Sequence, residues 1–289
     1  MRALGVCLLI IGSACSKPPP TAVITPPKPP QEKTPEPEPK PQEPAPIDEK
    51  ALAISPVDEP EWPMLKGDDE IRKAGGAPMP GGGYQIEKKG TPAIVVPGRI
   101  LMNSGLIELL GCAEGGKEHE TILRLECDIQ ILNTALILSH FSGGPVPKKL
   151  GQKGDQGSRL MVLVQWKVKD KVITHRAEDL VISVKRRGLM PRVGWTYVGA
   201  LVEVENAVTP NAKEKQKVLA ATGSRSLITT WRDPSTILDN PLPDAVDDMA
   251  FAANSVVLPE QGTAVTIIVR GPTKDEADAI AKLEAELAK

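Results

Sequence analysis

The residues from Gly111 to Thr121 read GCAEGGKEHET, a stretch that comes close to two catalytic signatures. GCAEGGKE follows the phosphate-loop pattern, but Glu118 stands where a Ser or Thr hydroxyl would bind magnesium. HETIL begins like the HExxH motif of zinc proteases, but Leu123 stands where that motif needs its second His ligand. Because each signature lacks a residue that its chemistry requires, we expect neither a nucleotide site nor a zinc-protease site here.

The pair Gly115–Gly116 favours a tight turn, because glycine readily adopts the positive backbone angles that short hairpins need. The segments on either side, GLIELLGC and KEHETILRLE, have the composition of strands. In a hairpin centred on the two glycines, Cys112 lies opposite His119, with the Cβ atoms about 4.5–5.5 Å apart. We therefore expect an antiparallel hairpin that places a thiol beside an imidazole.

Lys117, His119 and Glu120 are the side chains of this hairpin that we expect to contact a ligand. Cys112 and His119 are also candidates for a metal or redox site, because thiolates and imidazoles are metal ligands. His119 or Glu120 acting as a general base would make the chain a hydrolase, the third hypothesis. The alternative to all three is structural: the same side chains hold the hairpin together through hydrogen bonds.

The cysteines indicate a chain without a redox cofactor. Outside the cytoplasm Cys112 and Cys127 would often pair, but the expected hairpin register places Cys127 opposite residue 104. A disulfide therefore requires the chain to fold back, and two buried free thiols are the alternative. No CxxC motif occurs, so the sequence gives no support to an iron–sulfur or thioredoxin-like centre, and we expect no cofactor.

Composition and spacing exclude several further partners. The formal net charge is -2, so no basic field attracts nucleic acid. Aromatic residues make up only 3% of the chain, which predicts an aliphatic core and no platform for stacking bases. Asp239, Asp247 and Asp248 lack the spacing of a calcium-binding loop, and we interpret them as acidic surface residues.

The N-terminus, MRALGVCLLIIGSACSK, has the layout of a secretion signal over residues 1–15. Its apolar run is shorter than the roughly 20 residues that span a bilayer. Gly12 to Cys15 is similar to the lipobox of bacterial lipoproteins, although Gly12 stands where that box usually has Leu. Plain cleavage after Ala14 and a retained anchor are the alternatives. We expect Cys15 to carry a lipid, and in every case the rest of the chain to lie outside the cytoplasm.

The rest of the chain divides by composition into three parts. Residues 16–87 comprise a Pro-rich segment, which we expect to be a disordered tether, and an irregular lead-in. Residues 88–271 contain short apolar runs separated by turns, which are typical of strands, and WKVKDKVITH predicts a hairpin turning at Lys169–Asp170. Residues 272–289 predict a terminal helix.

Two helices are expected beside the strands. DIQILNTALILSHF, from Asp128 to Phe141, has helical apolar spacing and a capping Asp at its start. Thr273 and Glu276 form the pattern of a capping box at the start of the terminal helix. The element list predicts an α+β fold, mainly antiparallel sheet with one internal helix and a short C-terminal helix.

The order of these segments resembles the YdjY-type domain of bacterial exported and lipid-linked proteins. The resemblance is carried by LIELLGCAEGGKEHETIL, ALILSHFSGGPV, WTYVGALVEV and NSVVLPEQGTAVTIIV, and it covers about residues 88–270. It implies an extracytoplasmic domain without an assigned biochemical role, in which Lys117, His119 and Glu120 occupy the matching positions. Together with the expected tether, it favours a lipid-anchored, non-enzymatic binding or assembly module in the cell envelope, with the membrane and an envelope protein as its partners.

Overall fold

The computed structural model describes residues 47–59, 62–63, 67–88, 90–145, 157–205 and 215–288. All of them belong to one compact unit, Pro46–Lys289. The expected secretion signal, the lipidation site Cys15 and the Pro-rich segment up to residue 46 lie outside the described residues.

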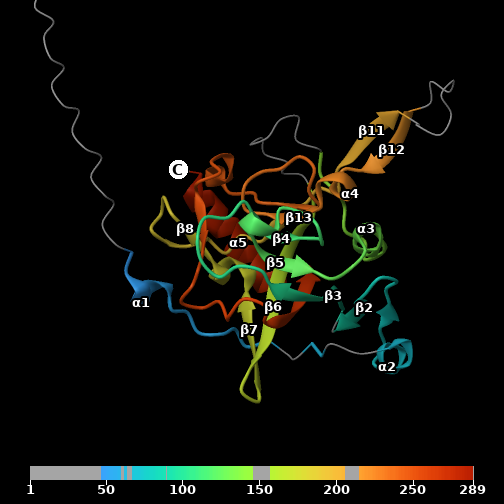
Figure 1. The fold of residues 1–289 in the computed structure, drawn as a ribbon, viewed down its shortest axis with the longest axis horizontal. Coiled ribbons are helices and arrows are strands. Elements are labelled where there is room, and N and C mark those ends of the chain that lie inside the picture. Colours follow the sequence, from blue (N-terminus) through green and yellow to red (C-terminus); the bar gives the residue numbers. More distant parts are fainter. Residues whose placement is uncertain are drawn as a thin grey trace, which may run out of the picture. The chain divides into compact units, whose positions relative to one another are not determined.

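The centre of the unit is a sheet that closes on itself. Strand β3 pairs with β16 along one edge and with β5 along the other, so the path from β16 through β6, β10, β14, β13 and β4 to β5 returns to β3 (Figure 1). The barrel strands are β3 (Thr91–Ile100), β4 (Leu109–Cys112), β5 (Thr121–Leu125), β6 (Arg159–Val168), β10 (Trp195–Tyr197), β13 (Ser226–Thr229), β14 (Leu238–Asp239) and β16 (Ala264–Arg270).

The expected α+β fold is therefore wrong: the chain forms a mostly-β barrel with few helices. Alternating apolar runs predict strands but carry no information on which strands meet at the ends of a sheet. Closure depends on pairings between distant segments, such as Gly98 with Leu125 and with Val265. Two neighbouring pairs, β4–β5 and β13–β14, are also parallel, which a predominantly antiparallel meander would not contain.

Further strands extend or flank the barrel. The expected turn at Lys169–Asp170 is confirmed, since β6 and β7 form a hairpin in which Val168 pairs with Lys171. The strands outside the barrel are β1 (Ala77–Pro78), β2 (Tyr84–Lys88), β7 (Lys171–Arg176), the ribbon of β11 (Leu201–Glu205) and β12 (Lys215–Leu219), and the small sheet of β8 (Val181–Ser183), β9 (Gly188–Leu189) and β15 (Phe251–Ala253).

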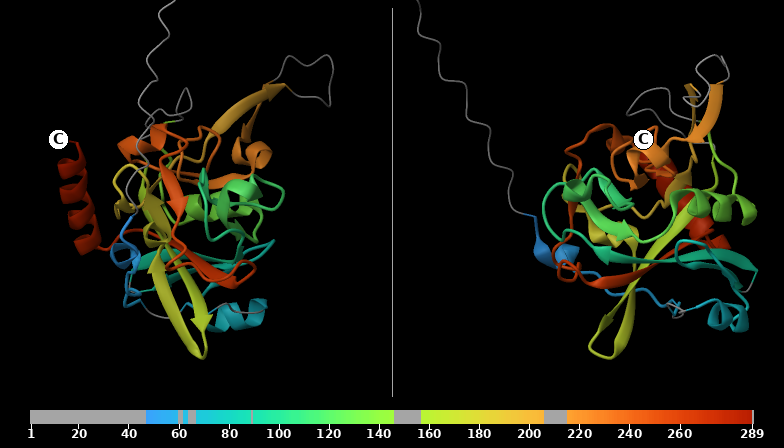
Figure 2. Two further views of the ribbon diagram at one scale, coloured as in Figure 1. Left: turned by 60° about the vertical axis from the view of Figure 1, so that its left-hand side comes forward. Right: turned by 45° about the vertical axis from the view of Figure 1, so that its right-hand side comes forward.

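Both expected helices are confirmed. Helix α3 (Ile129–Leu138) is capped by the Asp128 side chain, and α5 (Lys274–Leu287) begins with the capping box of Thr273 and Glu276. Helix α5 lies on the outside of the strands (Figure 2). Within the described residues, no helix combines the length and the apolar character needed to cross a membrane. The shorter helical elements are α1 (Glu49–Leu52), α2 (Asp68–Lys73), α4 (Ala221–Ser224), η1 (Glu118–Glu120), η2 (Ala177–Leu180) and η3 (Pro243–Val246).

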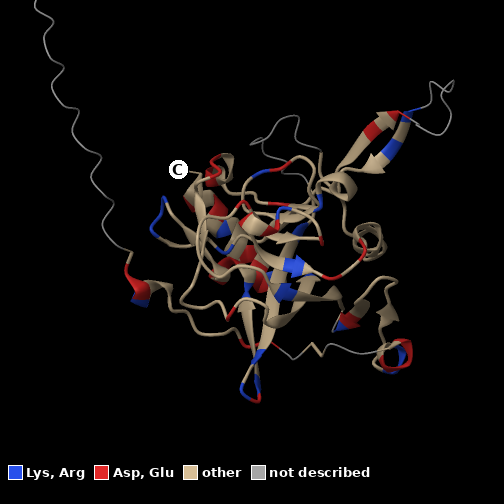
Figure 3. Cartoon of the chain, viewed as in Figure 1, with Lys and Arg blue, Asp and Glu red and all other residues tan. Residues whose placement is uncertain are grey.

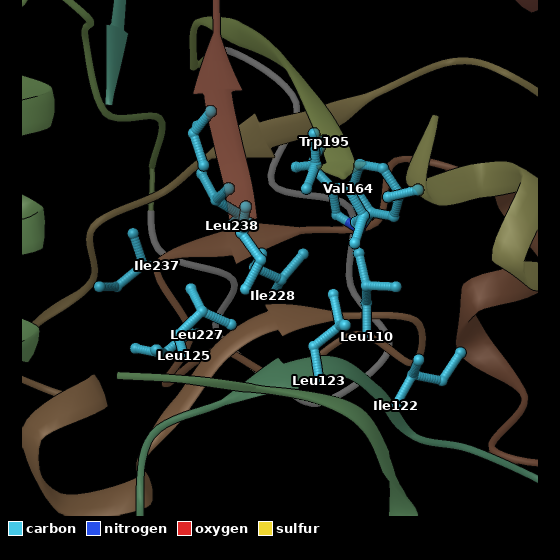
Figure 4. Packing of buried hydrophobic residues seen from close by; sticks show 14 of the residues in the cluster. Leu110, Ile122, Leu123, Leu125, Val164, Trp195, Leu227, Ile228, Ile237 and Leu238 are labelled. Carbon is cyan, nitrogen blue, oxygen red and sulfur yellow. The ribbon is translucent and has the colours of Figure 1, made fainter. Parts of the chain in front are cut away.

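The core is aliphatic, as the low aromatic content predicts. Leu110, Leu123 and Ile228 come from three neighbouring strands and pack in the cluster that also holds Trp195 (Figure 4). The indole N–H of Trp195 donates a hydrogen bond to the carbonyl oxygen of Thr229 at 2.7 Å, so this buried ring leaves no polar atom unsatisfied.

The lead-in, expected to be irregular, contributes to the packing. Trp62, Ile71 and Tyr84 are buried in a second apolar cluster with residues of β3, β6 and β16. The Tyr84 hydroxyl donates a hydrogen bond to the carbonyl oxygen of Pro63 at 2.7 Å. The part of residues 16–87 that the structure describes therefore covers one face of the sheet.

Gly98 lies at the point where the barrel closes. A Cβ atom at this position would stand 2.5 Å from the carbonyl oxygen of Arg124 and 2.5 Å from Cδ1 of Ile267. We predict that Gly98→Ala lowers the free energy of unfolding by about 1–3 kcal/mol, because the backbone of β5 must shift to accept the methyl group. Denaturant unfolding of the full chain measures the change. Gly188→Ala is the matched control, because a Cβ atom at that position would stand 4.0 Å from the carbonyl oxygen of Arg186. Equal effects of the two substitutions would contradict the prediction.

Candidate functional site

The GCAEGGKEHET stretch connects two parallel strands, so the expected hairpin is wrong. Strand β4 ends at Cys112 and β5 begins at Thr121, yet Thr121 lies beside Leu109 at the start of β4. The connection therefore runs back along β4, and the amide of Glu108 donates a hydrogen bond to the carbonyl oxygen of Glu120. The positive φ of 74° at Gly115 fits the expected turn, but the turn does not bring antiparallel arms together.

Cys112 and His119 are consequently not cross-strand neighbours. Cys112 lies opposite Arg124 and Ser226, is fully buried, and burial raises the pKa of its thiol to about 11. Burial also raises the pKa of the Cys127 thiol, to about 12, and both cysteines are free. The described residues contain no group of three or more His, Cys, Asp or Glu side chains arranged to hold a metal ion.

Lys117 holds the connection to the barrel. Its ammonium group forms an ion pair with Glu108, lies 3.6 Å from a carboxylate oxygen of Glu120, and stands 5.9 Å from the ring centre of Trp231. The hydrogen bond to Glu108 raises the pKa of Lys117 above its ordinary value. The carbonyl oxygen of Lys117 accepts a hydrogen bond from the Thr121 hydroxyl at 2.5 Å. Lys117 thus has structural contacts on both its side chain and its backbone.

His119 is exposed, whereas Glu120 is half-buried and its Oε2 atom is not accessible to solvent. The His119 side chain is 77% exposed, and its Nε2 atom lies 3.1 Å from Oε1 of Glu120. Glu118 stands where the phosphate-loop pattern needs Ser or Thr, and it accepts a hydrogen bond from the amide of Gly115 at 3.0 Å. A carboxylate can orient an imidazole for proton transfer, but neither His119 nor Glu120 lines the cavity nearby.

A cavity of about 660 Å³ opens beside this connection, at the C-terminal ends of β4 and β5. Its wall is polar and charged, and it includes the first turn of α3 and part of α4. The lining residues with charged side chains are Arg99, Glu114, Arg124, Glu126, Asp128 and Arg225. This volume is within the range of about 300–1,000 Å³ that is usual for small-molecule sites.

The arginines of the cavity were not among the residues that the sequence indicated. Arg99 belongs to β3 and Arg124 to β5, and only the register of those strands brings them together. Arg225 has a left-handed backbone conformation, and its guanidinium donates a hydrogen bond to the carbonyl oxygen of Glu114 at 2.8 Å. No sequence spacing indicates such a set, because its members come from three separate segments.

The chain belongs to the YdjY domain family, whose match extends over residues 91–270 and so includes the whole barrel. The connection with Lys117, His119 and Glu120, helix α3 and every residue that lines the cavity except Gly81 lie within the matched region. Searches of the curated proteins and of the solved structures found no match to the chain.

Proposed function

We propose that this chain is a lipid-anchored binding module of the cell envelope, which takes up a small ligand in the charged cavity and performs no chemistry on it. The observation that carries the proposal is the cavity itself, which has the volume of a small-molecule site and lies at the ends of two parallel barrel strands. A lipid on Cys15 is the membrane contact in this proposal, and an envelope protein is the expected macromolecular partner.

The contacts of the GGKEHE segment favour binding over catalysis. Lys117 and Glu120 form ion pairs that hold the connection between β4 and β5, and His119 is the most exposed side chain of the three candidates. Burial raises the pKa of the Cys112 thiol to about 11, so the thiol is protonated at neutral pH and is a poor nucleophile. The redox and hydrolase hypotheses therefore have less support than binding.

Blocking the cavity tests the binding function. Thr222 lines the cavity from α4 and is exposed, so we expect Thr222→Trp to fill it without disturbing the core. A thermal-shift screen of the full chain against charged and polar metabolites should give compounds that raise the melting temperature, and Thr222→Trp should abolish those shifts. Thr134→Trp, at an exposed position of α3 outside the cavity, should retain them. Shifts that survive in Thr222→Trp would place the site elsewhere, and turnover of a compound by the protein would overturn the non-enzymatic proposal.

Lipid attachment has its own test. In a bacterial host supplied with labelled palmitate, the full chain should incorporate label, and Cys15→Ser should remove it. Cys7→Ser is the matched control, because Cys7 lies within the apolar part of the expected signal and should leave labelling intact. Unlabelled wild-type protein, or label retained by Cys15→Ser, would contradict the anchor.

A further inference from the structure

Two arginines of the cavity stand directly opposite each other. Arg99 on β3 is paired in register with Arg124 on β5, and both line the cavity. Figure 3 shows basic residues on both strands. Directly opposed side chains have Cβ atoms about 4.5–5.5 Å apart, and two like charges in this arrangement destabilise a sheet. The Glu126 carboxylate forms ion pairs with both arginines and offsets part of this repulsion, and a further anion between the two guanidinium groups would reduce it more.

The carboxylates of the protein satisfy Arg99 but not Arg124. Glu126 accepts a hydrogen bond from Nε of Arg99 at 2.6 Å, but it lies 3.6 Å from Arg124. The other carboxylates near Arg124 are those of Glu114 at 3.6 Å and Glu118 at 3.8 Å. Charge-assisted hydrogen bonds are about 2.7–2.9 Å long, so these are ion pairs without hydrogen bonds. The Nε atom of Arg124 is also buried without a partner among the described residues.

The N-terminus of α3 adds positive potential on one side of the cavity. Ile129 and Gln130, in the first turn of α3, line the cavity, and a helix N-terminus attracts anions. Asp128 also lines it, but its side chain accepts a hydrogen bond from the amide of Ile131 at 2.9 Å and so serves as the helix cap. Glu114 has a side chain that is 83% exposed, so it can turn into solvent when another anion approaches Arg124.

We propose that the cavity binds a small organic carboxylate, with its two oxygens held between Arg99 and Arg124. The planar guanidinium fork matches a carboxylate, and the unsatisfied Nε donor of Arg124 gains an acceptor. A phosphate dianion is a poorer occupant, because Glu114, Glu126 and Asp128 line the same cavity and repel a second negative charge. This inference rests on the proposed binding function and names the chemical class of its ligand.

Calorimetric titration of the full chain, purified in detergent, tests the ligand class. The probes are propionate, inorganic phosphate and propionamide, in which a neutral amide replaces the carboxylate. We expect propionate, which carries one negative charge, to bind with a Kd of about 0.1–1 mM, and phosphate to bind at least about tenfold more weakly. Propionamide should give no binding. Absence of propionate binding, or phosphate binding as tight as that of propionate, would overturn the assignment to a carboxylate.

Arginine-to-lysine substitutions test the residues. Arg124→Lys keeps the charge but removes the fork, so we expect it to weaken propionate binding at least about tenfold. Arg99→Lys is a second variant with the same expectation, should Arg124→Lys lower the melting temperature. Arg72→Lys, at an exposed ion pair on α2, should bind as the wild type does. Unchanged affinity in both cavity variants would overturn the inference.

One outcome separates this inference from the proposed function. If a compound of another class binds and Thr222→Trp abolishes its binding while no carboxylate binds, this inference fails and the proposed function stands.

Discussion

Glu178→Ala should lower the free energy of unfolding by about 3–5 kcal/mol, the largest effect that we expect of a substitution outside the apolar core. Glu178 is fully buried in η2 and accepts hydrogen bonds from Arg176 at 2.6 Å and 3.2 Å. It also accepts one from the amide of Gly194 at 2.8 Å, directly before β10. Truncation leaves a buried guanidinium without its carboxylate and a backbone N–H without its acceptor, and both are costly.

Denaturant unfolding of the full chain measures this effect. Two further variants are compared with it, one as a control and one as a compensating double substitution. Glu203→Ala breaks an ion pair with Lys215 in which both side chains are more than half exposed, so we expect a change of at most about 0.5 kcal/mol. The double variant Arg176→Met/Glu178→Leu should recover part of the lost stability, because it removes both charges together. If Glu178→Ala costs no more than Glu203→Ala, the buried pair does not stabilise the link between η2 and β10.

The features that the sequence predicts are those that neighbouring residues determine. The Asp128 cap, the capping box of Thr273 and Glu276, and the turn at Lys169–Asp170 each depend on a few consecutive residues. The closure of the barrel does not, because β3 and β5 are separated by β4 and its connections. The same limit explains the hairpin error, since Gly115 indicates a turn but not the direction in which the chain leaves it.

The candidate site shows the same difference between features set by neighbouring residues and features set by distant strand pairings. The GGKEHE segment predicted Lys117, His119 and Glu120 as ligand contacts. However, the ion-pair partner of Lys117 is Glu108, which precedes β4. The apposition of Arg99 and Arg124 follows from a register that no local pattern encodes. A motif therefore indicated the neighbourhood of the cavity, while long-range pairing supplied its most distinctive residues.

Asp239 illustrates the same limit for a buried charge, because it was expected on an acidic surface. It is only 1% exposed on β14, whereas Asp247 and Asp248 are exposed as expected. Burial raises the pKa of Asp239 to about 7, despite the opposing influence of Arg232. Oδ2 of Asp239 has no hydrogen-bond partner, and the Nε atom of Arg232 lies 3.9 Å from it. At this distance the charge of Arg232 does not offset the loss of hydration of the buried Asp239 carboxylate.

The raised pKa predicts a pH dependence of stability. In the unfolded chain Asp239 ionises near its ordinary pKa of 3.8, so between about pH 4 and pH 7 the folded protein holds a proton that the unfolded chain has lost. The stabilisation from this group is complete below the unfolded pKa and disappears as the pH rises through about 7. Between pH 5 and pH 8 the wild type should lose on the order of 2–3 kcal/mol from this group alone.

Asp239→Asn isolates that contribution, because an amide does not titrate and can still accept the hydrogen bond that the Thr229 hydroxyl donates to Oδ1 at 3.1 Å. Its free energy of unfolding, measured in denaturant at pH 5 and pH 8, should fall by on the order of 2–3 kcal/mol less than that of the wild type over this interval. Asp247→Asn, an exposed acid nearby, should follow the wild-type curve. Parallel curves for Asp239→Asn and the wild type would mean that Asp239 has the same proton affinity in both states. Divergence would mean that the contact between β13 and β14 depends on a neutral carboxyl group, because Asp239 lies on β14 and is hydrogen-bonded to Thr229 on β13.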